Sequence, residues 1–314
     1  MDAVIPTRLS IIILASLSLA PVAAAQDPVV EDSAFRVPVD DPAYPRGTGP
    51  LVLLDEAHHN THSLTGFYRP FGELLRADGY QVATLRESIT PSRLAGADVL
   101  VISNALPAAS QEEADTLGSA FTRDELEALV SWIRSGGALL LFVDHRPFPR
   151  AAQDLGTQLG VEMLDGYALD YEVWDPIVFS RDRGTLGTHP IIDGRSPRER
   201  VDSVATFYGH AMRALDPGVR PLLIFGPEIE SMQPEGLWDI GDDTPRVAVR
   251  GWLQGAARVF GEGRVVVYGE AAMAVAQRTG PQREPRGMNT AVGAQNAQLM
   301  LNTLRWLSGV LPEL

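Results

Sequence analysis

Two short clusters of histidine and acidic residues hold the side chains best suited to chemistry. The first is the stretch LLDEAHHNTH, residues 53–62, which contains three of the chain's six histidines and two adjacent acids. The second is the pair Asp144 and His145, and Glu270 follows a later apolar run. Imidazole and carboxylate groups together can bind a divalent metal, transfer protons, or hydrogen-bond to a polar ligand.

One hypothesis from these residues is a metal-dependent hydrolase with a zinc-like ion. It would use histidines and acids from both clusters, with His58, His62, Asp144 and His145 as ligands and Glu56 or Glu270 as general base. The spacing HHNTH differs from the H-E-x-x-H pattern of helical zinc sites, because no glutamate follows His58. The alternative is that the same groups form hydrogen-bond networks without a metal.

Composition narrows the classes of function. The chain has 314 residues, 45% of them hydrophobic, which is enough for one large domain. Its formal net charge of −14 repels phosphate backbones and argues against nucleic-acid binding. The absence of cysteine excludes disulfides, thiolate metal ligands and a cysteine nucleophile.

Residues 1–25 have the pattern of a signal peptide. Arg8 precedes an apolar run at residues 9–20 that is too short to span a membrane comfortably. Ala23 and Ala25 form an A-x-A cleavage site, which makes Gln26 the mature N-terminus. We therefore expect an exported protein, periplasmic or extracellular, with no integral membrane segment after cleavage. An uncleaved N-terminal anchor is the alternative.

The mature chain is expected to contain a leader and a single domain. Residues 26–48 are rich in Pro, Asp and Gly and predict an extended or disordered leader. In residues 49–314, apolar runs at 50–56, 81–86, 97–105 and 138–145 predict strands, separated by segments of which 67–80 and 122–135 have helical spacing. The β-α-β order predicts a three-layer α/β sandwich with a mostly parallel sheet.

The second half of the domain is less regular. Residues 149–249 are rich in turns and predict irregular, antiparallel additions to the sheet, whereas residues 248–272 predict a hairpin. A final helix is expected from about residue 296, with Asn296 as its N-cap. The isolated His189 and His210 are expected to be a turn anchor and a core histidine.

The chemistry-bearing residues stand at the predicted strand ends. Ligands of open parallel sheets bind at the carboxyl ends of the strands, so we expect one cleft to gather six residues from three strands: Asp55, Glu56, His58, Asp144, His145 and Glu270. Asp55 and Asn104 would bind a ligand there. Asn289, in a loop that could fold over this edge, would join them.

Several stretches together resemble a known family. The segments FTRDELEALVSWIRSGGALLLFVDH, GEGRVVVYGEAAM and NAQLMLNTLRWLSG, in this order, resemble class I glutamine-amidotransferase-like domains. Within that group they look closest to secreted bacterial proteins of unknown function and to GldG-like auxiliary domains of transport systems. The resemblance implies a flavodoxin-like fold. It does not imply glutaminase activity, because Asp144 and His145 stand where the family's nucleophilic cysteine is expected.

The sequence thus predicts a secreted amidotransferase-like domain without glutaminase activity. Its expected partner is a polar small molecule, a glycan or a peptide, bound at the carboxyl ends of the strands. The metal-dependent hydrolase remains the alternative at the same edge.

Overall fold

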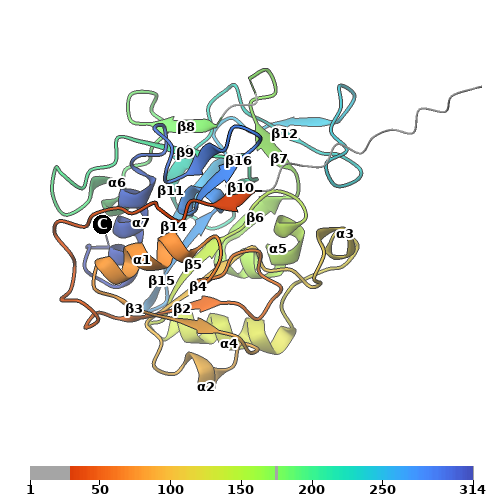
Figure 1. The fold of residues 1–314 in the computed structure, drawn as a ribbon. Helices are drawn as coiled ribbons and strands as arrows, with labels where there is room; N and C mark the ends of the chain where they lie inside the picture. The colour runs from red at the N-terminus through yellow and green to blue at the C-terminus, as the bar shows by residue number, and fades with distance from the viewer. Residues whose placement is uncertain (1–28, 174–175, 314) are drawn as a thin grey trace, which may run out of the picture.

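The computed structural model describes residues 29–173 and 176–313, so the predicted signal peptide lies outside the described residues. Its centre is a nine-stranded sheet, the largest within the described residues (Figure 1). Five strands run parallel in the order β3-β2-β4-β5-β15. Their bounds are Gln81–Leu85, Leu51–Asp55, Val99–Ser103, Ala138–Phe142 and Gly263–Tyr268.

The order of the parallel strands identifies the fold class. Numbered along the chain from β2, the strands read 2-1-3-4-5, which is the flavodoxin-like order with a switch point between β2 and β4. Antiparallel strands extend the sheet beyond β15: β14 (Leu253–Phe260), β10 (Ala211–Ala214), β6 (Val161–Leu164) and β11 (Arg220–Ile224). The predicted three-layer α/β sandwich with a mostly parallel, flavodoxin-like sheet is confirmed.

Helices cover both faces of the sheet (Figure 1). One face packs against α1 (Arg69–Ala77) and α7 (Asn296–Leu307), and the other against α2 (Pro91–Leu94), α4 (Arg123–Arg134) and α5 (Phe148–Leu159). All five residues of β4 and of β5 are buried, as a sheet covered on both faces requires. Among the described residues, no helix combines the length and apolar character needed to cross a bilayer.

The N-termini of α4 and α7 can be compared with what the local sequence pattern indicates. The N-terminus of α4 has the capping box that the T-x-x-E spacing of Thr122 and Glu125 indicates. The Thr122 hydroxyl accepts from the Glu125 N–H, and the Glu125 carboxylate accepts from the Thr122 N–H. The prediction that Asn296 caps α7 is wrong, because Gln295 occupies that position. The buried Asn296 amide instead bonds the backbone of Ala205, 3.0 Å to its N–H and 2.8 Å to its carbonyl.

The region after β5 adds small antiparallel sheets at the strand-end edge. One contains β7 (Tyr167–Leu169), β12 (Glu230–Met232) and β13 (Arg246–Ala248), and another pairs β8 (Ile177–Ser180) with β9 (Ser203–Thr206). Three short helices complete this edge and its flanks: α3 (Gln111–Ala114), α6 (Pro190–Asp193) and the 3-10 helix η1 (Ala272–Ala274).

The leader is extended and packed on the domain. Its strand β1 (Val30–Glu31) pairs with β16 (Ala276–Thr279), which pairs with β17 (Glu284–Gly287). Further along, Phe35, Val37, Val39 and Tyr44 pack against the main core. Through these contacts the described part of the leader packs onto the domain and forms part of its surface.

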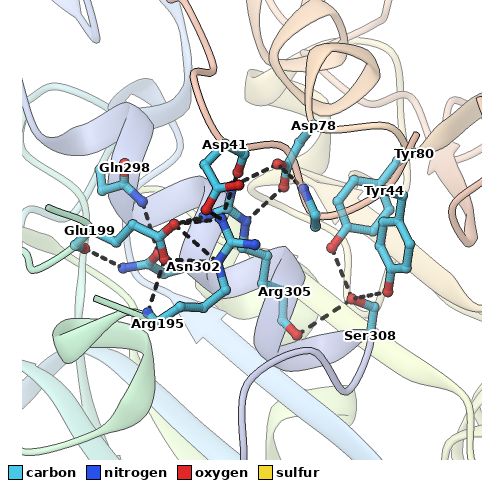
Figure 2. Close-up of polar contacts among 11 residues, drawn as sticks. Asp41, Tyr44, Asp78, Tyr80, Arg195, Glu199, Gln298, Asn302, Arg305 and Ser308 are labelled. Atoms are coloured by element: carbon cyan, nitrogen blue, oxygen red, sulfur yellow. Dashed lines mark hydrogen bonds and ion pairs between the residues drawn. The ribbon is translucent and has the colours of Figure 1, made fainter. Parts of the chain in front are cut away.

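A buried ionic network fastens the leader to the rest of the domain (Figure 2). Arg305, 2% exposed on α7, donates two hydrogen bonds to the Asp78 carboxylate, of 2.9 and 2.6 Å. It also pairs with Glu199 at 3.0 Å and donates to the Asp41 carbonyl of the leader at 3.0 Å. Arg195 bonds both Glu199 and the same Asp41 carbonyl.

This network predicts a large loss of stability when its central cation is removed. Arg305→Met should lower the free energy of unfolding by about 3–5 kcal/mol, because Asp78 would remain buried without a cationic partner and Glu199 would keep only Arg195. Urea denaturation followed by circular dichroism measures the change. Arg123→Met is the control: it breaks the exposed pair with Glu127, whose side chains are 89% and 62% exposed, and should cost less than about 1 kcal/mol. Equal losses in the two variants would contradict the assigned role of the network.

Candidate functional site

A cleft of about 470 Å³ opens at the carboxyl ends of the parallel strands. Its volume lies within the range of roughly 300–1,000 Å³ typical of small-ligand sites. Aromatic side chains form much of the wall, namely Phe67, Phe148, Phe207, Tyr208 and Trp238. Polar side chains converge between them: Asn104, Gln111, Asp144, Gln277 and Arg286, with His62 and His145.

The structure brings four of the predicted site residues together on this cleft. His62, Asn104, Asp144 and His145 all line it. The other five, Asp55, Glu56, His58, Glu270 and Asn289, are not part of its lining and make contacts elsewhere. The predicted edge is thus the right place for a cleft, but only part of the predicted set faces into it.

His58 belongs to a buried ionic network next to the cleft. Its Nδ1 lies 2.9 Å from Asp55 Oδ2, and its Nε2 lies 3.0 Å from Glu125 Oε1 on α4. Both partners are carboxylates, so both ring nitrogens donate and the ring is an imidazolium. Burial lowers the pKa of His58, but the hydrogen bonds and charges of Asp55 and Glu125 outweigh it and raise that pKa above its ordinary value.

Glu56 and Asn289 hold loops. Glu56 accepts from the Leu64 N–H at 2.9 Å and pairs with Arg86 at 3.2 Å, which closes the loop after β2. Asn289 donates to Asp32 and to the Gln277 carbonyl, both at 3.1 Å. Asn289 therefore ties the C-terminal loop to the leader rather than binding a ligand in the cleft.

His62 presents an open nitrogen to the cleft. A chain of hydrogen bonds fixes its tautomer: Tyr68 donates to the Ala271 carbonyl, so Ser103 must donate to Tyr68, and His62 Nδ1–H must donate to Ser103 Oγ. Nε2 then carries a lone pair. Burial lowers the pKa of His62 to about 4, so the ring is neutral at neutral pH.

Asp144 and His145 form the floor of the cleft with Asn104. Asn104 has a positive φ of 49°, and its side-chain oxygen accepts from the Asp144 N–H at 2.9 Å, which leaves its NH₂ group toward the cleft. His145 Nδ1 donates to the Arg146 carbonyl at 2.7 Å, and its Nε2 lies 4.0 Å from Asp144 Oδ1. The floor thus presents the Nε2 atoms of two imidazoles and a carboxylate.

Glu270 lies behind the cleft wall. Its carboxyl oxygens accept from the N–H groups of Ala272 and Met273, at 2.7 and 2.8 Å, and so hold the first residues of η1. Burial, with a smaller effect from the charge of Asp144, raises the pKa of Glu270 to about 8. The side chain is fully buried and does not line the cleft, so it positions Ala272 in the wall.

The remaining buried histidines have the expected structural places. His189 accepts from the Ile191 N–H at 3.2 Å and caps α6 as a turn anchor. His210 donates from Nδ1 to the Val143 carbonyl at 2.9 Å, but its buried Nε2 has no hydrogen-bond partner. Burial lowers the pKa of each to about 4.

The residues predicted as zinc ligands do not form a ligand set. Among the described residues, no three His, Asp or Glu side chains lie close enough together to hold a metal ion. His58 has both nitrogens engaged by carboxylates, and the imidazoles of His62 and His145 border the cleft without converging with a third ligand.

Sequence reasoning missed Trp238 and the two residues of the β16–β17 hairpin that line the cleft, Gln277 and Arg286. They lie in turn-rich or short-strand segments with no periodic pattern. The one available signal was an isolated tryptophan in a segment of Gly, Asp and Pro, where a large apolar side chain has no local reason to be.

Comparison with known proteins supports the fold alone. No family model matches the chain, and no curated protein matches it significantly. Among solved structures, an "mmIFT52 N-terminal domain" is 14% identical with a TM-score of 0.58, over 82% of this chain and 97% of that one. A ThuA-like protein from Bacteroides uniformis is 13% identical with a TM-score of 0.46, and the match covers 86% of this chain and 93% of that one. A cytoplasmic protein from Salmonella typhimurium is 14% identical with a TM-score of 0.45, and the match covers 82% of this chain and 98% of that one.

The raised pKa of His58 predicts a specific pH dependence of stability. A folded-state pKa above the model value of 6.5 means that the folded protein binds this proton more tightly. The stabilisation is complete below that value and is lost as pH rises through the folded-state pKa. The free energy of unfolding, measured with urea, should therefore decline between about pH 6 and pH 9. This decline should be smaller in His58→Gln than in the wild type.

The comparison between variants isolates His58 from other groups that titrate in the same range, such as Glu270. The exposed neighbour His59 provides the control, and His59→Asn, which tolerates the positive φ of 46°, should keep the wild-type decline. If His58→Gln retained the full wild-type slope, the imidazolium assignment would be wrong.

Proposed function

We propose that this protein is an exported domain that binds a glycan in the strand-end cleft. The proposal rests chiefly on the cleft's combination of an exposed aromatic platform with outward-facing hydrogen-bond acceptors. Sugars offer an apolar C–H face and a rim of hydroxyl groups, and such a cleft is complementary to both. Export is the expectation from residues 1–25.

Trp238 is the platform. Its side chain is 53% exposed at the cleft although tryptophan is usually covered. Its backbone has a positive φ of 58°, which is costly for a large residue, and its N–H is held at 3.2 Å by the Tyr167 hydroxyl. The ring contacts His145 edge-on with 4.5 Å between centroids, so it is fixed before any ligand arrives.

The floor of the cleft suits hydroxyl groups. His62 Nε2, His145 Nε2 and the Asp144 carboxylate can each accept a hydrogen bond, and the Asn104 NH₂ group can donate one. The stack of His145 on Tyr167, with 4.8 Å between ring centroids, keeps its open nitrogen in place. A neutral sugar ring on Trp238 could satisfy these acceptors with its hydroxyl hydrogens.

Glutaminase activity is not part of the proposal. The chain has no cysteine, so it cannot form the thioester on which the family's activity depends. A metal-dependent hydrolase is less well supported, since no group of three ligands comes together in the described part of the chain.

The proposal predicts that Trp238 is needed for glycan capture. On an array of microbial and plant glycans, labelled wild-type protein should bind at least one structural class, and Trp238→Ala should weaken that binding about tenfold or more. Val292→Ala removes an equally exposed apolar side chain outside the cleft and should bind as the wild type does. Wild-type binding by Trp238→Ala would show that the cleft is not the site, and an array without any bound glycan would contradict the function.

A further inference from the structure

We infer that the glycan bound in this cleft is acidic and that Arg286 binds its carboxylate, as in a hexuronic acid residue. The inference rests on the proposed function and specifies its ligand class. It follows from the position of Arg286, from what holds its guanidinium, and from the absence of an acidic partner among the described residues.

Arg286 reaches the cleft from the small sheet above the strand ends. It lies on β17 directly opposite Gln277 on β16. Side chains directly opposite each other in an antiparallel pair project from the same face, and both of these line the cleft. The hairpin therefore presents a cation and an amide side by side to a ligand.

The guanidinium is held in place by neutral groups. One nitrogen, Nη2, donates to the Phe207 carbonyl at 3.2 Å. The guanidinium carbon lies 5.0 Å from the centre of the Tyr208 ring and 5.5 Å from that of the Phe207 ring. Such contacts orient the planar group without neutralising its charge, and they leave most of its five N–H donors without an acceptor among residues 29–173 and 176–313.

No ion pair with a described residue neutralises this cation. Burial and the charge of Asp144 raise the pKa of the buried Glu270 to about 8, although the charge of Arg286 tends to lower that pKa, so Glu270 is largely protonated at neutral pH. Among the described residues, no carboxylate oxygen lies within ion-pair distance of Arg286. This includes the carboxylate of Asp144, which lines the same cleft. Arg278, on the same small sheet, shows the contrast, because it pairs with Asp32 at 2.8 Å. An oriented guanidinium that pairs with no carboxylate in the described part of a chain of net charge −14 is a ready site for a ligand carboxylate, which it can bind through two parallel hydrogen bonds.

The cleft contains two charged groups of opposite sign from different elements, Asp144 just after β5 and Arg286 on β17. Hydroxyl groups of the ligand would face Asp144, His62 and His145, where acceptors predominate, and an acidic group there would be repelled. The carboxylate would lie at the β16–β17 hairpin, against Arg286. A hexuronic acid residue has this arrangement, with hydroxyl groups on most ring carbons and one carboxylate at C5.

Calorimetry with matched ligands tests the inference. The probes are oligosaccharides of galacturonic, glucuronic and mannuronic acid, each compared with its methyl ester and with the corresponding neutral hexose oligosaccharide. For at least one sugar, wild-type protein should bind the acid about tenfold or more tightly than the ester, and this ratio should fall with added NaCl. Arg286→Gln should bring the ratio close to one, whereas Arg286→Lys should give an intermediate ratio.

Arg123→Gln is the control, because it removes the same charge from an exposed position on α4 outside the cleft. It should keep the wild-type ratio. If the wild type bound acid and ester equally and Trp238→Ala weakened both, the inference of an acidic ligand would be wrong. The proposed function would still hold in that case. An acid-to-ester ratio unchanged in Arg286→Gln would overturn the role of Arg286. Failure of every acidic, esterified and neutral probe to bind would overturn both proposals.

Discussion

The buried pair between Arg305 and Asp78 holds together segments that are distant in the sequence. Asp78 ends α1, Arg305 lies in the last helix, and the same guanidinium reaches Glu199 and the Asp41 carbonyl. Asp78 also accepts from the Ala43 N–H at 2.8 Å. Each charged partner is buried, so each needs the others to offset its loss of hydration. This constraint fixes the leader against α7 (Figure 2).

The fixed leader in turn builds one wall of the cleft. Its strand β1 pairs with β16, and Asp32 just beyond accepts from Arg278 and Asn289. Burial tends to raise the pKa of Asp32, but these hydrogen bonds and the charge of Arg278 outweigh it and lower the pKa. The β16–β17 hairpin that carries Arg286 is thus anchored through the leader to the ionic network on the far side of the domain. Anchoring of this kind gives a binding site a defined shape before the ligand enters.

The histidines show how environment assigns different roles to one residue type. His58 is charged between two carboxylates, and it joins the loop after β2 to α4. His62 is neutral because it is buried and bonded to Ser103. His145 rests on Tyr167 and bonds a carbonyl, so its other nitrogen stays open. The cluster that looked like one metal site is therefore divided between a structural network and a cleft.

The sequence by itself determined the sheet, its main helices and the edge where polar groups gather. Apolar runs such as Val99–Ser103 and the capping box of Thr122 and Glu125 act through local spacing, which the sequence displays directly. The carboxyl ends of parallel strands also meet by topology, so the cleft's position, with Asn104 and Asp144 on it, was predictable.

Only the tertiary structure decided which side chains face the ligand. Asp55 and His58 stand as close to a strand end as His62 does, yet Glu125, 67 positions after His58, draws that imidazole away from the cleft. Trp238 and Arg286 reach the cleft from segments without periodicity, through contacts with Tyr167 and Phe207. Such contacts depend on distances between residues far apart in the chain, and local spacing carries no information about them.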